Sequence, residues 1–127
     1  ITALRAAAIP SVRGVFGGGG ARYIIDELDR GACGAMPAVE LTDLHAALWS
    51  AYAAGDRAQA RRLYRLSLPL LVAQAIYRMR LTKYVLAQRG IADARRVRAP
   101  LPEMDALTQR DVDTMLADLL AEFPAKK

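Results

Sequence analysis

Two short apolar runs near the start of the chain have the length of β-strands, residues 12–16 (VRGVF) and 35–39 (AMPAV). Residues 21–30, between them, repeat apolar side chains at helical spacing, and Gly31 stands where a glycine commonly ends a helix. Residues 1–8 have the pattern of the last turns of an earlier helix. This part of the chain therefore predicts the order helix, strand, helix, strand.

After these runs, the apolar positions recur with the period of an α-helix. One stripe covers residues 41–52, a second covers 77–85 and a third covers 112–123. Residues 91–107 contain Pro100 and Pro102 and no regular stripe, which predicts an irregular connector. We expect Thr108 to cap the last helix, because a side-chain oxygen at that position accepts a backbone N–H.

Individual residues predict where the middle helices begin, bend and end. Gly55 and Gly90 each follow an apolar stripe and predict a helix end. Asp56 suits the N-cap of the next helix, and Gln59 stands three residues later as its reciprocal capping partner. Pro69 lies inside the helical pattern and predicts a kink or a break, because proline has no N–H to donate.

The alternation of strands and helices predicts parallel strands joined by a right-handed crossover. Parallel sheets are almost always covered on both faces, and two short strands do not form a stable sheet alone. The strands therefore have the pattern of the end of a longer series. We expect an α/β fold that is the C-terminal piece of a larger protein and is mostly helical by residue count.

Composition excludes several classes of protein. The chain has 127 residues, of which 54% are hydrophobic and 24% charged, so it can bury a core. A single cysteine excludes an internal disulfide framework, and a single histidine excludes the usual zinc motifs. Residues 66–77 form the longest central stretch without a charge, far short of the roughly 20 apolar residues of a membrane span. We expect a soluble, cytoplasmic protein that needs no metal.

The positive charge of the chain is concentrated in its middle. The net charge is −1 over residues 1–55, +9 over residues 56–98 and −3 over residues 99–127. A basic block of this kind could bind the phosphates of a nucleic acid, in which case the chain is a small helical binding module. The interpretation we favour is that acidic segments cover the block in the folded protein or that the block is a solvated face, because no nucleic-acid-binding motif accompanies it.

The order of motifs from residue 14 onward resembles the late part of a known enzyme family. A strand leads through a run of glycines into a helix, which is followed by residues 30–36 (RGACGAM) and a second strand. The turn at 54–56 (AGD), the helical segments around 68–70 and 81–83, and the connector at 97–102 (VRAPLP) continue the pattern. Together these motifs resemble the dihydrodipicolinate synthase and N-acetylneuraminate lyase family of class I, Schiff-base aldolases.

The resemblance implies the C-terminal part of a (β/α)₈ TIM barrel, a fold of about 250 residues. Residues 1–54 would hold the tail of helix six, strand seven (12–16), helix seven, strand eight (35–39) and helix eight. Residues 55–127 would form a C-terminal helical extension. The family's Schiff-base lysine lies on strand six and its proton-relay tyrosine on an earlier strand. Both would therefore precede Ile1, and this segment would hold no catalytic residue.

The resemblance also implies the chemistry and the partners. The parent enzyme would act on pyruvate or a related 2-oxo acid as a lyase, synthase or dehydratase, without a metal or an organic cofactor. The expected partners are the N-terminal part of the same polypeptide, the 2-oxo acid and further copies in a homo-oligomer. We expect no membrane partner and no nucleic acid, and we expect the 127-residue chain alone to be inactive.

Two short segments would line the substrate pocket at the C-terminal face of such a barrel. The expected substrate-binding residues are Gly17, Gly18, Gly19, Gly20, Met36, Pro37 and Ala38. The glycines would let a ligand approach the backbone, although a tight turn between strand and helix explains them equally well. Met36 fits a core position equally well. In the sialic-acid lyase branch this loop carries acidic side chains that bind substrate hydroxyls, so its glycines here favour a different substrate.

Four other features fit structural roles better than catalytic ones. Cys33 has no neighbouring histidine in the sequence, and we expect it to be a small packed residue. His45 shares a helix face with leucines. Glu40 and Asp43 suit the first turn of a helix, where negative charge is favourable. Lys83 lies on a helix of the extension, away from the expected pocket.

Overall fold

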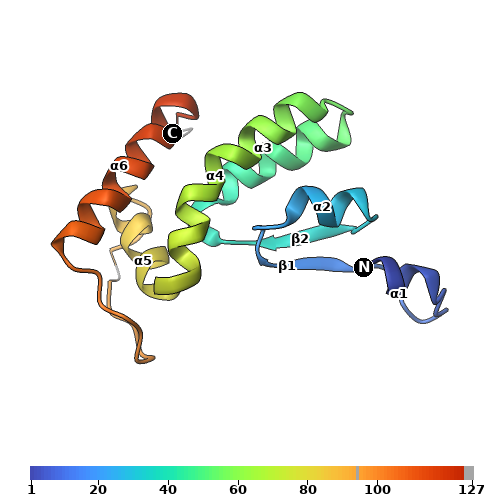
Figure 1. Ribbon diagram of the computed structural model, residues 1–127, viewed down its shortest axis with the longest axis horizontal. Coiled ribbons are helices and arrows are strands. Elements are labelled where there is room, and N and C mark those ends of the chain that lie inside the picture. Colours follow the sequence, from blue (N-terminus) through green and yellow to red (C-terminus); the bar gives the residue numbers. More distant parts are fainter. Residues whose placement is uncertain (94, 125–127) are drawn as a thin grey trace.

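The computed structural model describes residues 1–93 and 95–124. Two short strands near the start are followed mainly by helices (Figure 1). The elements are α1 (Thr2–Ala6), β1 (Phe16–Gly20), α2 (Ile24–Asp29), β2 (Gly34–Pro37), the 3₁₀ turn η1 (Val39–Leu41), α3 (Thr42–Ala53), α4 (Arg57–Tyr77), α5 (Met79–Gln88) and α6 (Ala106–Glu122). The predicted element order is therefore confirmed.

The two strands are parallel neighbours, as predicted. Phe16 pairs with Gly34 and Gly17 pairs with Ala35. Helix α2 connects the strands and lies along one side of them (Figure 1). This strand, helix, strand unit is the building block of parallel α/β folds.

The first strand lies further along the chain than its apolar residues predict. Residues 12–15 precede β1, and the strand runs from Phe16 through Gly20, so the glycines belong to the strand, with irregular pairing between Gly17 and Gly20. Pairing with β2 sets the position of the strand. The N–H of Cys33 donates to the carbonyl of Val15, and the pairing of β1 with β2 then continues from Phe16. Strand formation follows such contacts more than intrinsic preference.

The second strand and the first helix are shorter than predicted. β2 ends at Pro37, and Val39 belongs to η1 and not to the strand. The N–H of Ala38 donates to the carbonyl of Gly20, and the N–H of Leu41 then donates to the carbonyl of Ala38 and closes the turn. Helix α1 covers Thr2–Ala6, where residues 1–8 are predicted to be helical.

The helix ends agree with the predictions in most places. Asp56 caps α4 by accepting the N–H of Gln59 at 2.9 Å. The N–H of Asp56 donates to the carbonyl of Ala51 and not to the Gln59 side chain, so the predicted reciprocal bond does not form in the described part of the chain. Gly31, Gly55 and Gly90 each follow the last residues of a helix. The prediction for the last helix is wrong, because Asp105 and not Thr108 is its N-cap and accepts the N–H of Thr108 at 2.8 Å.

Helix α4 continues through Pro69 without a break. Figure 1 shows that its second half bends away from the direction of its first half, which fits the predicted kink but not a split. This one helix contacts both α3 and α5. Proline therefore shapes the helix here without ending it.

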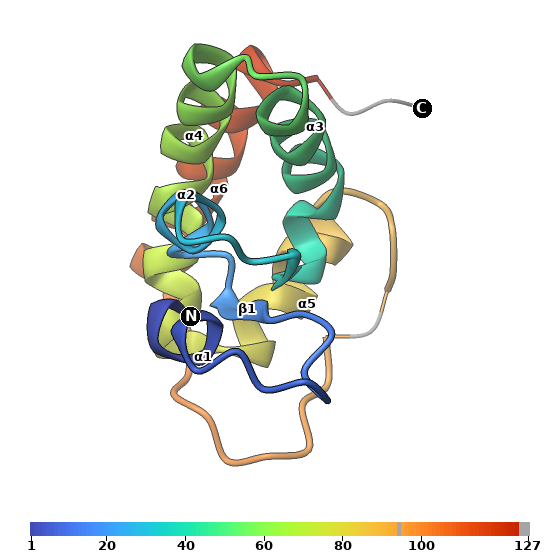
Figure 2. The same cartoon turned by 90° about the vertical axis from the view of Figure 1, so that its right-hand side faces the viewer.

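The predicted apolar stripes form one continuous core. Helix α3 lies beside α4, and α6 packs against α4 as well (Figures 1 and 2). The largest fully buried apolar side chains in the described part of the chain are leucines of η1, α3, α4 and α5, with valines of α5 and α6. None of the helices in residues 1–93 and 95–124 combines the length and apolar character that crossing a membrane requires.

Candidate functional site

The strand pair presents two faces with opposite surroundings. Gly17 is buried on the face that α2 covers, and a Cβ placed there would overlap the carboxylate of Glu27 of α2. Side chains alternate along a strand, so Phe16 points to the other face. Phe16 is 62% exposed and Met36 is 67% exposed. Large apolar side chains therefore lie on a sheet face that the described residues leave uncovered.

The glycines of β1 have different surroundings at successive positions. A Cβ at Gly18 would meet nothing within 4 Å, so this glycine borders open space. Gly19 and Gly20 have φ of 65° and 71°, a region that non-glycine residues rarely adopt. The chain turns here, and Ala21 continues with a φ of 73°. The turn brings the next residue, Arg22, back over the end of the strand.

Arg22 is half-buried and tied to helix α4. Its Nη1 donates to Gln74 Oε1 at 2.8 Å and to the carbonyl of Leu71 at 3.3 Å. Its carbonyl accepts the hydroxyl of Tyr64 at 2.6 Å. The guanidinium therefore has a fixed place at the C-terminal end of β1.

A small polar pocket lies between this end of β1 and the junction of α4 and α5. Its volume is about 190 Å³, and it is lined by Gly19, Gly20, Arg22, Gln74, Ala75 and Arg78. Arg78 connects the two helices with φ 49° and ψ −127°, a strained conformation for a residue with a side chain. Of the four predicted glycines, Gly19 and Gly20 border this polar pocket, which two arginines also line, whereas Gly17 and Gly18 do not line it.

The second predicted segment is divided among different surroundings. Met36 is exposed on the uncovered sheet face, and Pro37 is half-buried. Ala38 is buried, and a Cβ at Gly20 would lie 3.5 Å from its methyl group. The structure therefore brings Ala38 and Gly20 together, whereas Met36 faces the same side as Phe16. The core placement considered for Met36 does not occur in the described residues.

A larger, mostly apolar cavity of about 310 Å³ lies beside β2 and α3. Phe16, Ala35, His45 and Trp49 contribute to its walls. Both ring nitrogens of His45 are buried without a hydrogen-bond partner among the described residues. Burial lowers the pKa of His45 to about 4, and the nearby charge of Asp43 only partly opposes this. The imidazole is therefore neutral near pH 7, as suits a structural residue.

The remaining residues singled out from the sequence lie outside the two pockets described above or take no visible part in binding. Cys33 is exposed, where we expect a packed residue. Lys83 is half-buried and its Nζ donates to the carbonyl of Arg96 at 2.5 Å, so its ammonium is held by the backbone. Lys126 and Lys127 lie outside the described residues. Glu40 is fully buried on η1, and burial raises the pKa of its carboxyl.

Sequence reasoning missed Arg22, Gln74 and Arg78 as possible site residues. Arg22 directly follows the glycine run, so its position could have been found from the sequence. Gln74 and Arg78 lie about fifty residues later on a helix with no local motif. Only the packing of α4 against the end of β1 brings them to the glycines.

No protein-family model and no curated protein matches the sequence. Among solved structures, the chain is similar to a dihydrodipicolinate synthase from Rhodopseudomonas palustris, with a TM-score of 0.79 and 28% sequence identity. The similarity covers 91% of this chain and 40% of that one, so this chain spans less than half the length of the enzyme. Over most of its length, the chain therefore has the fold of part of a dihydrodipicolinate synthase, as its motifs predict.

Proposed function

We propose that this chain is the C-terminal part of a barrel enzyme that acts on pyruvate or a related 2-oxo acid. The observation that carries the proposal is the similarity to a dihydrodipicolinate synthase over 91% of the chain. The uncovered sheet face supports it, because parallel strands are almost always covered on both faces. The rest of a barrel would cover Phe16 and Met36.

The apolar cavity beside β2 is where another strand of the proposed barrel would pack. β2 has a described partner on one side, β1, and its other edge carries unpaired backbone groups. The wall formed by Phe16, Ala35 and Trp49 is apolar, as suits a further strand. A strand seated there would satisfy the backbone groups and bury the wall.

The proposed chemistry places the reacting amine outside this chain. A lysine amine would attack the ketone carbon of the 2-oxo acid and, with loss of water, form an imine. The protonated imine withdraws electrons, so that the neighbouring carbon can lose a proton to give an enamine that attacks an aldehyde, or, in the reverse direction, the carbon–carbon bond breaks to leave the enamine. The segments at Gly18–Gly20 and Met36–Ala38 would shape the pocket at the C-terminal ends of the strands.

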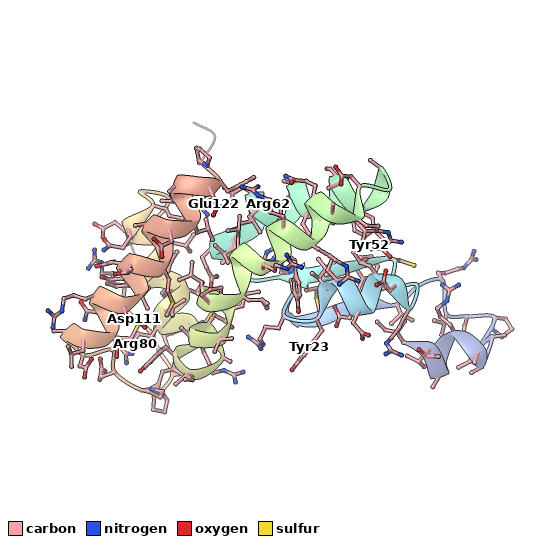
Figure 3. The ribbon with its side chains drawn as sticks, turned by 45° about the horizontal axis from the view of Figure 1, so that its top comes forward. Tyr23, Tyr52, Arg62, Arg80, Asp111 and Glu122 are labelled. Atoms are coloured by element: carbon pink, nitrogen blue, oxygen red, sulfur yellow. The ribbon has the colours of Figure 1, made fainter. Side chains whose placement is uncertain are left out.

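The nucleic-acid alternative has less support, because acidic side chains from flanking segments pair with five arginines of the basic block. Among the described residues, Arg62 lies 2.8 Å from Glu122 of α6 (Figure 3), and Arg80 lies 2.7 Å from Glu103. Three further arginines of the block also pair with acids outside it, Arg57 and Arg61 with Asp29, and Arg89 with Asp43. These pairs favour a basic block covered by acidic segments.

Trapping with pyruvate and borohydride, followed by intact mass measurement, tests the proposal. We expect no adduct on the 127-residue chain, because Lys83 is held by a backbone carbonyl. We expect one adduct on a polypeptide extended upstream by about 170 residues, enough to complete a barrel.

Two outcomes would contradict this proposal. A stoichiometric adduct on the 127-residue chain that Lys83→Arg abolishes would place the reacting amine on α5. The absence of an adduct on the extended polypeptide would remove the Schiff-base chemistry. Binding of DNA or RNA that weakens steeply with salt would favour the nucleic-acid alternative.

A further inference from the structure

We infer that the pocket between the end of β1 and the junction of α4 and α5 binds a carboxylate of the substrate, one that a 2-oxo acid with two carboxylates carries in addition to the carboxylate beside its ketone. The substrate assignment rests on the proposed function, whereas the anion site rests on the pocket alone. The pocket volume is about 190 Å³. At roughly 30 Å³ per water molecule, this is room for a carboxylate and a few waters.

Arg22 is prepared to donate to such an anion. Its Nη1 donates to Gln74 Oε1 and to the carbonyl of Leu71. Its Nη2 and Nε have no hydrogen-bond partner among the described residues, and neither atom is a buried unsatisfied donor. These two donors therefore remain accessible, and an arginine held in one orientation loses little entropy when a carboxylate binds.

Arg78 adds a second positive charge at the same pocket. In residues 1–93 and 95–124, no carboxylate lies within 4.0 Å of the guanidinium of Arg22 or of Arg78. Five arginines of the basic block pair with acids in the described part of the chain, and Arg78 is not one of them. Two cations without a counter-charge favour an anionic ligand.

The backbone of Arg78 gives an independent reason to assign a role to this position. Its φ of 49° and ψ of −127° cost free energy for a residue with a side chain, and such strain gathers at functional sites. The N–H of Arg78 donates to the carbonyl of Gln74, and its carbonyl accepts the N–H of Thr82. The junction therefore holds Arg78 and Gln74 together at one wall of the pocket.

The glycines leave space in front of the Arg22 guanidinium. A Cβ at Gly20 would lie 3.7 Å from Arg22 Nη1, and a Cβ at Gly19 would lie 3.8 Å from Nη2. Any larger side chain would occupy the place where an anion could meet these donors. The glycine run thus lets a ligand approach, at the strand end where parallel α/β folds bind their ligands.

Titration of the full chain with succinate, followed by amide and guanidinium NMR signals, tests the inference. We expect saturable changes at Gly19, Gly20 and the Arg22 guanidinium. Arg78→Ala is expected to weaken binding roughly tenfold or more, the loss expected for one hydrogen bond to a charged group. Arg65→Ala is the matched control, because Arg65 is exposed on α4 and does not line the pocket. Arg22→Lys, which keeps the charge, tests the need for a planar donor.

Several results would overturn the inference. Equal effects of Arg78→Ala and Arg65→Ala would mean that net charge alone attracts the anion. Tighter binding of inorganic phosphate than of succinate would replace the carboxylate with a phosphate group. If the extended polypeptide forms the pyruvate adduct but succinate does not bind, the site fails and the proposed function stands. If succinate binds but the adduct never forms, the assignment to a substrate fails.

Discussion

His45 and Glu40 are buried ionisable residues whose charged forms are disfavoured by the fold. His45 is 3% exposed and Glu40 is fully buried. Burial lowers the pKa of His45 to about 4 and raises the pKa of Glu40, with Thr82 opposing part of the rise. Both groups therefore tend toward their neutral forms in the folded chain. His45 therefore makes the folded chain less stable as the pH falls, and Glu40 makes it less stable as the pH rises.

The first prediction is that stability falls between pH 6.5 and pH 4 because of His45. In this window the unfolded chain, with the ordinary pKa of 6.5, binds a proton that the folded chain resists until about pH 4. The full loss is roughly 3 kcal/mol, from a shift of about 2.5 pK units at 1.36 kcal/mol each. Urea unfolding at pH 7, 6 and 5 measures the part of this loss that falls above pH 5.

His45→Leu is the informative variant, because the chain has one histidine. We expect the loss of stability between pH 7 and pH 5 to be much smaller in this variant. Glu40 acts in the opposite direction, since its raised pKa contributes stability that is lost as pH rises above its ordinary value of 4.5. An equally steep loss in His45→Leu would contradict the prediction.

At the scale of elements, one ion pair connects α5 to α3. Arg89, whose side chain is 5% exposed, donates through Nη2 to Asp43 Oδ2 at 2.5 Å and through Nη1 to Oδ1 at 3.1 Å. Its Nη1 also donates to the carbonyl of Glu40. The hydrogen bond from Arg89 lowers the pKa of Asp43. The pair thus fixes the end of α5 against η1 and the start of α3.

The second prediction is that Arg89→Met destabilises the fold by about 3 kcal/mol, the low end for breaking a buried pair, because Asp43 is 38% exposed. Arg62→Met is the control, since Arg62 and Glu122 form an exposed pair whose loss costs under about 1 kcal/mol. Denaturant midpoints of the two variants measure the difference. Equal losses would show that burial does not strengthen the Arg89 pair.

At the scale of the whole molecule, apolar side chains remain exposed on the sheet. Phe16 and Met36 are 62% and 67% exposed on the face opposite α2. Contiguous exposed apolar surface on a folded chain marks a contact with another protein segment or an aggregation hazard. The isolated chain therefore carries a surface suited to association.

The third prediction is that the 127-residue chain self-associates through this face. We expect the weight-average mass in sedimentation to rise with concentration and Phe16→Asp with Met36→Asp to abolish the rise. Leu107→Asp is the matched control, because Leu107 is 67% exposed on α6, away from the sheet. A monomer at every concentration would contradict the prediction that this sheet face drives self-association.

The element order could be predicted because it depends on local patterns. The stripes at 41–52 and 112–123 reach the core, since a helix of regular period turns the same residues to one side. The position of β1 could not be predicted, because residues 12–16 have the better strand composition whereas the glycines pair with β2. Of the candidate site, the glycines could be found from the sequence, but their neighbours Gln74 and Arg78 could not.

The sequence by itself determined the helices, their glycine ends, the parallel strand pair and the resemblance to part of an aldolase barrel. These features follow from side-chain periodicity and short motifs, which act within a few residues. Only the tertiary structure decided which residues surround the end of β1. The bend of α4 beside Pro69 and the strained junction at Arg78 carry its last turn to Gly19 and Gly20. Contacts between residues so far apart depend on packing, which no local pattern encodes.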